Sequence, residues 1–419
     1  MTAVVAALTA VACTEPAAPP VTRRSPARSA PPSPVAGPND PLCRLPPLAP
    51  RPTVARRPLP KAIAEVADEV EEVRGVEFTR PITVDPVDQA EIGGLLKRAL
   101  DRSYPQEMMD RRARAWSTIG LIPRGTDLRK ALGDFAGSQI VGFYDTQTHQ
   151  LVFSGSASPT PHERVTLSHE LTHALDDQRF NLSRLDELEG ACQDEQLAAL
   201  IALAEGDAVT MSLRWASANL SPEELTQWNQ EASSFPPPPP SVPEFVIDLF
   251  IAPYQVGPVF VESLLSEGGI PALNRAFRNP PVTTEQVLHP ERYRRDRPTD
   301  VDVAEIAEKL GGPWEPLDVY QVGELWLRVA LDLRLSDEEA ESAAAGWDGG
   351  EYRAWSDGDD VAVLLQTVWD SAGDASQFAD SMRRWIDDEV AAVERRGTFV
   401  QVLFGTSRRV VRDLESATA

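Results

Sequence analysis

The chain has 419 residues, 42% of them hydrophobic, and a formal net charge of −24 at pH 7. This length and apolar content suffice for one large folded domain or two moderate ones. The negative charge argues against a nucleic-acid-binding protein, since contact with phosphates requires concentrated Lys and Arg. Solubility is the simplest reason for such acidity.

An apolar run opens the chain and ends in small residues before Cys13. This segment, residues 1–13, is similar to a bacterial lipoprotein signal, in which the cysteine carries lipid. Two features depart from that pattern, since no Lys or Arg precedes the run and Ala10 stands where Leu is usual. A plain secretory signal or a frayed end is the alternative. We expect an extracytoplasmic protein, lipid-anchored on the bacterial cell surface or secreted.

The segment 1–13 is too short to span a membrane, and no later apolar run is expected to be long and uncharged enough to do so. Membrane contact is therefore expected only through the lipid. Residues 14–60 are rich in Pro, Ala, Ser and Arg, without periodicity. Such a composition cannot bury a core and predicts a disordered tether. One folded domain is expected over residues 61–419.

Helical spacing opens near Lys61 and recurs around Asp88–Ser103 and Gln106–Ile119. A β-hairpin is predicted over Gln139–Phe153, where two β-rich runs flank turn residues. We therefore expect an α+β fold that is predominantly α-helical, with a small hairpin or sheet before the next helix.

That next helix is predicted from Pro161 or His162 to about Arg179, and another spans roughly Asp194 to Trp215. After the proline run at 237–240, residues 241–419 are expected to form a helical subdomain. Its end is predicted to be a hairpin of Thr398–Phe404 and Arg409–Asp413.

The helix from Pro161 contains the motif His-Glu-Leu-Thr-His. His169 and His173 lie one turn apart, about 6 Å along the axis, so both imidazoles point the same way, as two ligands of tetrahedral zinc require. Glu170 lies about 100° round the helix, close enough to take a proton from a water that zinc activates. The helix is expected to be buried, because an apolar stripe follows it through Leu167, Leu171, Ala174 and Leu175.

A catalytic zinc site usually has three protein ligands, so a third is needed. Metzincins have a glycine three residues after the second histidine and a third histidine three residues later, but Asp176 and Arg179 occupy those positions. This excludes the metzincin class.

Glu205 is the better third ligand. It lies at helical spacing in an apolar stripe with Leu197, Ile201 and Ala208, and a buried carboxylate costs several kcal/mol unless a metal or cation compensates it. Gly206 removes a side chain beside it, which is expected to let the two helices that carry the ligands approach closely.

The sequence His-Glu-Leu-Thr-His-Ala-Leu-Asp-Asp-Gln (169–178), followed by Ala-Glu-Gly-Asp-Ala (204–208), resembles the gluzincin type of zinc metallopeptidase. More narrowly, it resembles a bacterial group of neutral zinc metallopeptidases. The similarity extends through 283–293 and 346–350, and so covers most of residues 75–390.

Carried over residue by residue, the resemblance implies that His169, His173 and Glu205 bind zinc and that Glu170 is the general base. It also implies a zincin-like fold and hydrolysis of peptide bonds in a peptide or protein substrate. In such enzymes the substrate adds as an extended strand to an edge strand that precedes the metal helix. An extended peptide could add in the same way to the predicted hairpin of this chain. A purely structural hairpin is equally compatible with the sequence.

Several other residues are candidates for supporting roles in catalysis. His289 or Tyr293, and more weakly Tyr254, could donate a hydrogen bond to the developing oxyanion, although a structural His-Pro turn explains His289 as well. Asp177 or Asp207 could orient a ligand imidazole, and each could equally be a helix cap or a solvated charge.

Once Cys13 carries lipid, Cys43 and Cys192 remain as a pair that an oxidising compartment would join, and two reduced thiols are the alternative. Two other functions also fit the motif. One is a cell-envelope binding or assembly protein with a non-catalytic zinc site, and the other is a zinc amidase acting on a non-peptide cell-wall substrate. The sequence says nothing about oligomeric state.

Overall fold

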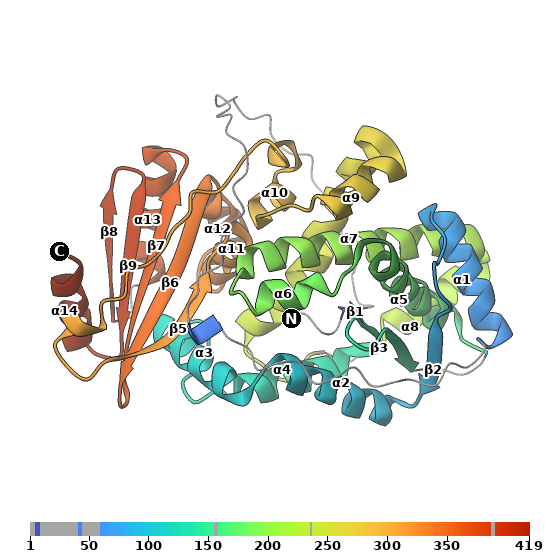
Figure 1. The fold of residues 1–419 in the computed structure, drawn as a ribbon, viewed down its shortest axis with the longest axis horizontal. Coiled ribbons are helices and arrows are strands. Elements are labelled where there is room, and N and C mark those ends of the chain that lie inside the picture. Colours follow the sequence, from blue (N-terminus) through green and yellow to red (C-terminus); the bar gives the residue numbers. More distant parts are fainter. Residues whose placement is uncertain (1–4, 9–40, 44–58, 155–157, 235–236, 387–389) are drawn as a thin grey trace.

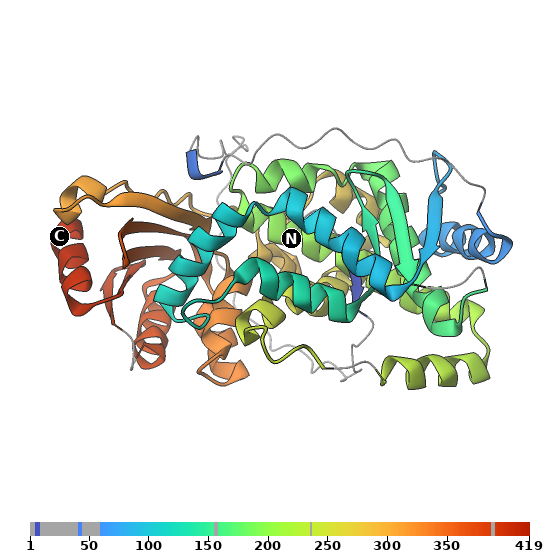
Figure 2. The same cartoon turned by 90° about the horizontal axis from the view of Figure 1, so that it is seen from below.

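A computed structural model of the chain shows a predominantly helical α+β protein with two sheets (Figure 1), so the predicted class is confirmed. Cys13 and most of the predicted tether at 14–60 lie outside the described residues. The five-stranded sheet lies at one end of the long axis and the first helix at the other (Figures 1 and 2). The structure describes residues 5–8, 41–43, 59–154, 158–234, 237–386 and 390–419.

The folded part begins with a helix at Lys61, as predicted. A glycine in the left-handed conformation, Gly75 with φ of 70°, ends this first helix. A capping box formed by Asp88 and Glu91 opens the second helix, because each side chain accepts a hydrogen bond from the other residue's backbone N–H. The first four helices are α1 (Lys61–Arg74), α2 (Gln89–Ser103), α3 (Gln106–Ile119) and α4 (Leu128–Gln139).

The first sheet has the strand order β1-β3-β4-β2. Strands β3 and β4 form the predicted antiparallel hairpin, and β2 runs parallel to β4. The segment predicted to be a signal contributes β1, which pairs antiparallel with β3 along the hairpin edge. These strands are β1 (Val5–Leu8), β2 (Thr83–Val87), β3 (Ile140–Asp145) and β4 (Gln150–Ser154).

The middle of the chain is helical. A capping box of Thr160 and Glu163 opens α5, with Pro161 in the first turn. From Pro161 to Asp177 nearly every residue of α5 is buried, so the helix is a central core element. Its neighbours in sequence are α6 (Arg184–Glu189), α7 (Asp194–Asn219), α8 (Pro222–Ala232) and α9 (Glu244–Arg278), and α5 itself is Pro161–Phe180.

By length and composition alone, α7 and α9 are apolar enough to cross a membrane. This corrects the expectation that no later segment would be. In this structure 78% of the apolar window of α7 and 44% of that of α9 are buried within the protein. Core helices of globular proteins pass the same test, and α7 packs against both α5 and α9.

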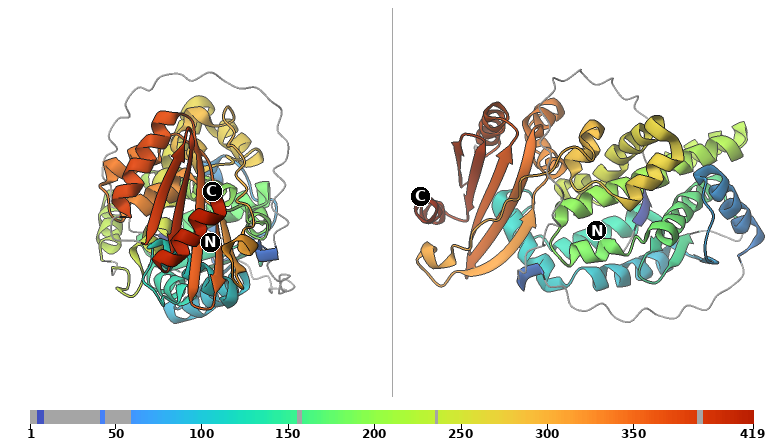
Figure 3. Two further views of the ribbon diagram at one scale, coloured as in Figure 1. Left: turned by 90° about the vertical axis from the view of Figure 1, so that its left-hand side faces the viewer. Right: turned by 45° about the horizontal axis from the view of Figure 1, so that its top comes forward.

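The C-terminal part is not the predicted helical subdomain. An antiparallel five-stranded sheet with the order β5-β6-β7-β9-β8 spans Glu315–Gly405, with helices on its two faces (Figures 1 and 3). The sheet consists of β5 (Glu315–Gln321), β6 (Trp347–Asp357), β7 (Asp360–Trp369), β8 (Ala391–Arg396) and β9 (Phe399–Gly405). Its helices are α10 (Thr284–Leu288), α11 (Glu324–Asp332), α12 (Asp337–Ala344), α13 (Ala372–Trp385) and α14 (Arg408–Thr418), with short 3-10 turns η1 (Pro41–Cys43), η2 (Pro290–Arg292) and η3 (Ala307–Leu310).

Burial on both faces explains why the sequence pattern of β7 does not distinguish it from a helix. One face of the sheet packs on α3, α11 and α13, and the other packs on α14 and η3. The central strand β7 therefore carries a nearly continuous apolar run instead of an alternating pattern, and such a run cannot be distinguished from a buried helix by periodicity. The predicted final hairpin is also wrong, because the turn lies at Gly397, between β8 and β9, and Ser407 caps α14.

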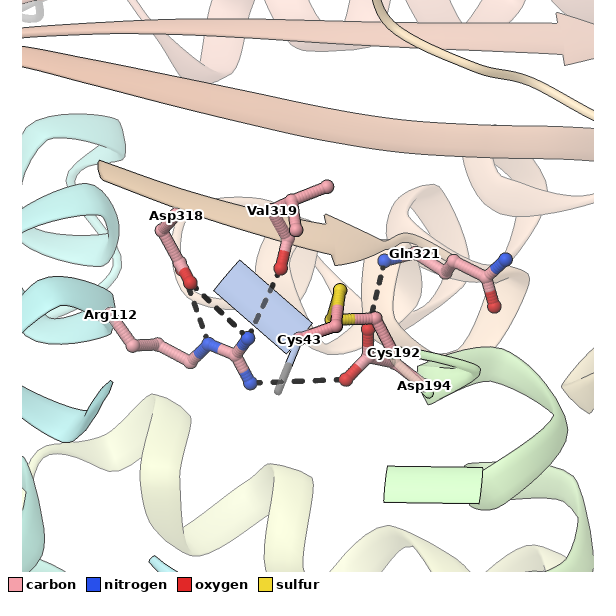
Figure 4. Close-up of a disulfide and its surroundings, with 7 residues drawn as sticks. All are labelled: Cys43, Arg112, Cys192, Asp194, Asp318, Val319 and Gln321. Atoms are coloured by element: carbon pink, nitrogen blue, oxygen red, sulfur yellow. Dashed lines mark hydrogen bonds and ion pairs between the residues drawn. A yellow bond between two sulfur atoms is a disulfide. The ribbon is translucent and has the colours of Figure 1, made fainter. Parts of the chain in front are cut away.

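The sheet and the helical part share one core, in which α3, α4 and α9 contact residues of the sheet. A disulfide joins Cys43 to Cys192, the pairing that the cysteine count predicted (Figure 4). Beside it, Arg112 of α3 binds Asp318 of β5 through its guanidinium, and Asp194 accepts a hydrogen bond from the backbone N–H of Gln321. These bonds fix the start of α7 against β5.

Candidate metal centre

Three predicted ligands converge between α5 and α7. The Nε2 atoms of His169 and His173 are 3.0 Å apart, and Oε2 of Glu205 lies 3.3 Å from the first and 3.4 Å from the second. The three side chains form a buried group able to hold a metal ion. Their exposed fractions are 4%, 0% and 2%.

The triangle has the size that zinc requires. Ligand atoms about 2.0–2.1 Å from a tetrahedral ion lie roughly 3.3 Å from one another. The buried Oε2 of Glu205 has no hydrogen-bond partner, which is costly for a carboxylate unless a cation neutralises it. Three protein ligands leave one tetrahedral position open, as in catalytic sites.

The electrostatics of His169 also suit metal binding. Burial lowers the pKa of its imidazole, and the neighbouring Glu205 carboxylate offsets this only in part. The ring is therefore neutral near pH 7, the form in which imidazole binds metals. Glu170 follows directly on α5 and is fully buried, with an exposed fraction of 0%.

A buried ionic network involves residues that lie close in sequence to the metal ligands. The guanidinium of Arg74 on α1 donates to Asp207 at 2.7 Å, to Asp176 at 3.1 Å and to Asn274 at 2.8 Å. Asp176 lies three residues after His173. The network therefore joins α1, α5, α7 and α9, the last three through residues Asp176, Asp207 and Asn274. Arg74 could not be identified from the sequence, because nothing near it in the chain marks its partners.

The two aspartates predicted to orient a ligand imidazole have other partners. Asp207 binds Arg74. Asp177 accepts hydrogen bonds from the Tyr144 hydroxyl, at 2.7 Å, and from the backbone N–H of Leu182, and its Oδ2 lies 2.7 Å from Nδ1 of His149. Asp177 thus ties the hairpin to the end of α5. Among the described contacts neither aspartate bonds to a ligand histidine, so these assignments are not supported.

The predicted oxyanion donors are also engaged elsewhere. Nε2 of His289 lies 2.9 Å from Glu324, and the Tyr293 hydroxyl donates to the Asn279 carbonyl at 2.5 Å. The structure does not bring either to the metal centre. It places Tyr254 there instead, since its ring stacks on His169 with centroids 6.2 Å apart and an interplanar angle of 11°.

Gly206 does allow a close helix approach, but to a different helix than predicted. A Cβ at Gly206 would lie 2.3 Å from the carbonyl carbon of Gly257 on α9, and one at Gly257 would lie 2.1 Å from the Ala202 carbonyl oxygen. Glycine is therefore needed at both positions. The backbone contact brings α9, and with it Tyr254, against the helix of Glu205.

A largely apolar cavity of about 110 Å³ is partly lined by residues that lie near the metal ligands in sequence. Ile201, one helical turn before Glu205, lines it, as does Pro253, which precedes Tyr254. The opposite walls are aromatic and come from Trp116, Tyr320 and Trp326. The position suits a bulky apolar group of a ligand held at the centre.

Comparison with known proteins leaves the metal centre unassigned. A family model described as "Domain of unknown function (DUF8575)" matches residues 316–418, which run from β5 to α14. No curated protein and no solved structure matches the chain. The matched segment contains the sheet and none of the residues of the metal centre.

Proposed function

We propose that this protein is an extracytoplasmic, zinc-dependent peptidase with a zincin-like arrangement. The convergence of His169, His173 and Glu205 within 3.0–3.4 Å of one another, with Glu170 beside them on α5, carries the proposal. The Cys43–Cys192 disulfide supports an oxidising location, where lipid on Cys13 would anchor the chain.

The residues of the metal centre would have distinct roles in the reaction. His169, His173 and Glu205 would hold zinc, which when bound supplies Lewis-acid polarisation of the scissile carbonyl and acidifies water in the site. Glu170 would accept a proton from the attacking water and pass it to the leaving amine. Tyr254, stacked on His169, would help to position the substrate.

The hairpin supports a peptide as the substrate. The edge of β3 is paired antiparallel with β1, which lies within the proposed signal segment, so removal of that segment would leave an edge to which an extended peptide could add through backbone hydrogen bonds. The apolar cavity beside Ile201 and Pro253 would take a bulky apolar side chain of that peptide.

A second function is favoured by one observation. The three ligands and Glu170 are each at most 4% exposed, and such closure is more typical of zinc sites that do not turn over substrate. A cell-envelope binding protein with a non-catalytic zinc site would show this burial. The open fourth position favours the peptidase.

To test the peptidase proposal, a peptide library is incubated with three samples of the purified protein: untreated, treated with a metal chelator, and supplied again with zinc after that treatment. We expect cleavage that chelation abolishes and zinc recovers, with apolar residues enriched beside the cut bond. Cleavage that persists in the chelator would contradict the proposal. Hydrolysis of cell-wall amides without any peptide cleavage would identify the zinc amidase instead.

A further inference from the structure

A second concave site lies at the C-terminal end of α5, outside the metal centre. It is a pocket of about 600 Å³, to which five separate chain segments contribute. These are the loop before β2, the β3–β4 turn, the end of α5, the start of α6 and the end of α9. Four arginines line this arginine pocket: Arg80, Arg179, Arg184 and Arg278.

The four pocket arginines lack the carboxylate partners that Arg74 and Arg292 have. Arg74 pairs with two aspartates, and Arg292 pairs with Glu285, Asp296 and Asp370. Within the part of the chain that the structure describes, no carboxylate forms an ion pair with any of the four pocket arginines. In a chain with a net charge of −24, four guanidinium groups without ion pairs around one cavity form a local concentration of positive charge.

Two of the guanidinium groups are held in place with donors to spare. Arg179 donates from Nε to the Glu77 carbonyl at 2.6 Å, and Arg184 donates to the Phe277 carbonyl at 2.5 Å. Nε of Arg184 is buried without a hydrogen-bond partner. Since each guanidinium has five N–H donors, the pocket retains many for a ligand.

The remaining walls fit an anion as well. The carboxylate in the lining, Asp177, is already engaged by Tyr144 and by the Leu182 backbone. Phe180 and Phe277 stack at 4.9 Å, and the Arg278 guanidinium lies 5.5 Å from the Phe180 ring centroid. The aromatic pair forms a rigid wall that keeps Arg278 at the pocket.

We propose that the arginine pocket binds a small soluble molecule bearing phosphate groups. A planar guanidinium donates two parallel N–H bonds to phosphate oxygens, and several such forks around one cavity suit a ligand with two or more negative charges. The pocket is larger than a single phosphate needs, so the ligand is expected to be a diphosphate or a phosphate ester. This inference does not depend on the peptidase proposal.

Titration calorimetry of the full chain with sodium pyrophosphate at low ionic strength tests the proposal. We expect saturable binding that the Arg80→Gln/Arg278→Gln double variant weakens at least about tenfold. The matched control, Arg214→Gln/Arg383→Gln, removes two arginines whose side chains are 43% and 48% exposed at other places, and it should bind as the wild type does. Circular dichroism checks that each variant is folded.

Two further arms distinguish the arginine pocket from the metal centre and from a membrane surface as the place of binding. Pyrophosphate chelates metals, so the Glu205→Ala variant is titrated as well, and retained binding there supports the arginine pocket. Binding lost in Glu205→Ala but kept in the pocket variant would overturn the proposal. So would equal loss in the control variant, no binding of pyrophosphate, or binding only to vesicles of anionic phospholipid.

Discussion

Replacing Arg74 by Met should destabilise the protein strongly, because the change leaves Asp176 and Asp207 buried without their cation. All three side chains have an exposed fraction of 0%. Arg74 makes two charge-assisted hydrogen bonds to them, at 3.1 and 2.7 Å, and a third bond to Asn274. Removing one partner of a buried ion pair typically costs about 3–5 kcal/mol.

We therefore expect the free energy of unfolding of Arg74→Met to fall by about 4 kcal/mol near pH 8. The deficit should shrink in acid. Burial, followed by the charge of Asp207, raises the pKa of Asp176, and without Arg74 protonation of this pair would relieve more of the penalty. Since Asp176 and Asp207 lie within three residues of His173 and Glu205 on α5 and α7, a shift of these helices should also lower zinc affinity.

Urea unfolding followed by tryptophan fluorescence measures the first effect, and competition with a zinc indicator measures the second. Lys61→Met is the matched control, because it removes a cation from the same helix at a side chain that is 91% exposed. It should change stability by less than about 0.5 kcal/mol. An Arg74→Met variant as stable as this control would refute the reasoning.

Three other perturbations follow from the fold. Replacing Cys43 and Cys192 by Ser opens a covalent loop with a sequence separation of 149 and should cost about 2–5 kcal/mol; unchanged urea unfolding would contradict this. Gly206→Ala should lower the free energy of unfolding by about 3 kcal/mol, because the added Cβ would separate α7 from α9. The control Gly133→Ala adds a Cβ in open space on α4 and should not destabilise the protein. Equal melting temperatures of the two variants would refute the backbone contact. Burial raises the pKa of Glu195 to about 7, above its usual value of 4.5, so the folded state holds this proton more tightly and the contribution of Glu195 to stability should fall by roughly 3 kcal/mol between pH 4.5 and 7. Glu195→Gln should remove that part of the pH dependence, and identical pH profiles of the two proteins would exclude Glu195 as a source.

The parts of the fold that were predictable carry local signals. The β3–β4 hairpin has turn residues between β-rich runs, and α5 has a cap, a proline in its first turn and its histidines one turn apart. Glu205 could be identified because a carboxylate in an apolar stripe requires compensation. The structure brings it to His169 and His173, more than thirty residues away in sequence.

The features that could not be predicted depend on contacts between residues that lie far apart in the sequence. The central strand β7 is buried on both faces, which removes the alternation that marks a strand. Arg74 becomes a supporting residue only because α1 packs beside α5 and α7. Nothing near His289 and Tyr293 in the sequence marks their partners, and the structure engages them with Glu324 and Asn279 instead of the metal centre.

The most direct test of the central proposal measures zinc content and peptide cleavage on the same preparations of wild type and Glu170→Gln. Glu170 is not one of the converging ligands, so both proteins should contain one zinc per chain. Cleavage should be detected for the wild type and should fall by at least about 100-fold in the variant. Stoichiometric zinc with equal cleavage in both, or with none in the wild type, would contradict the proposed peptidase.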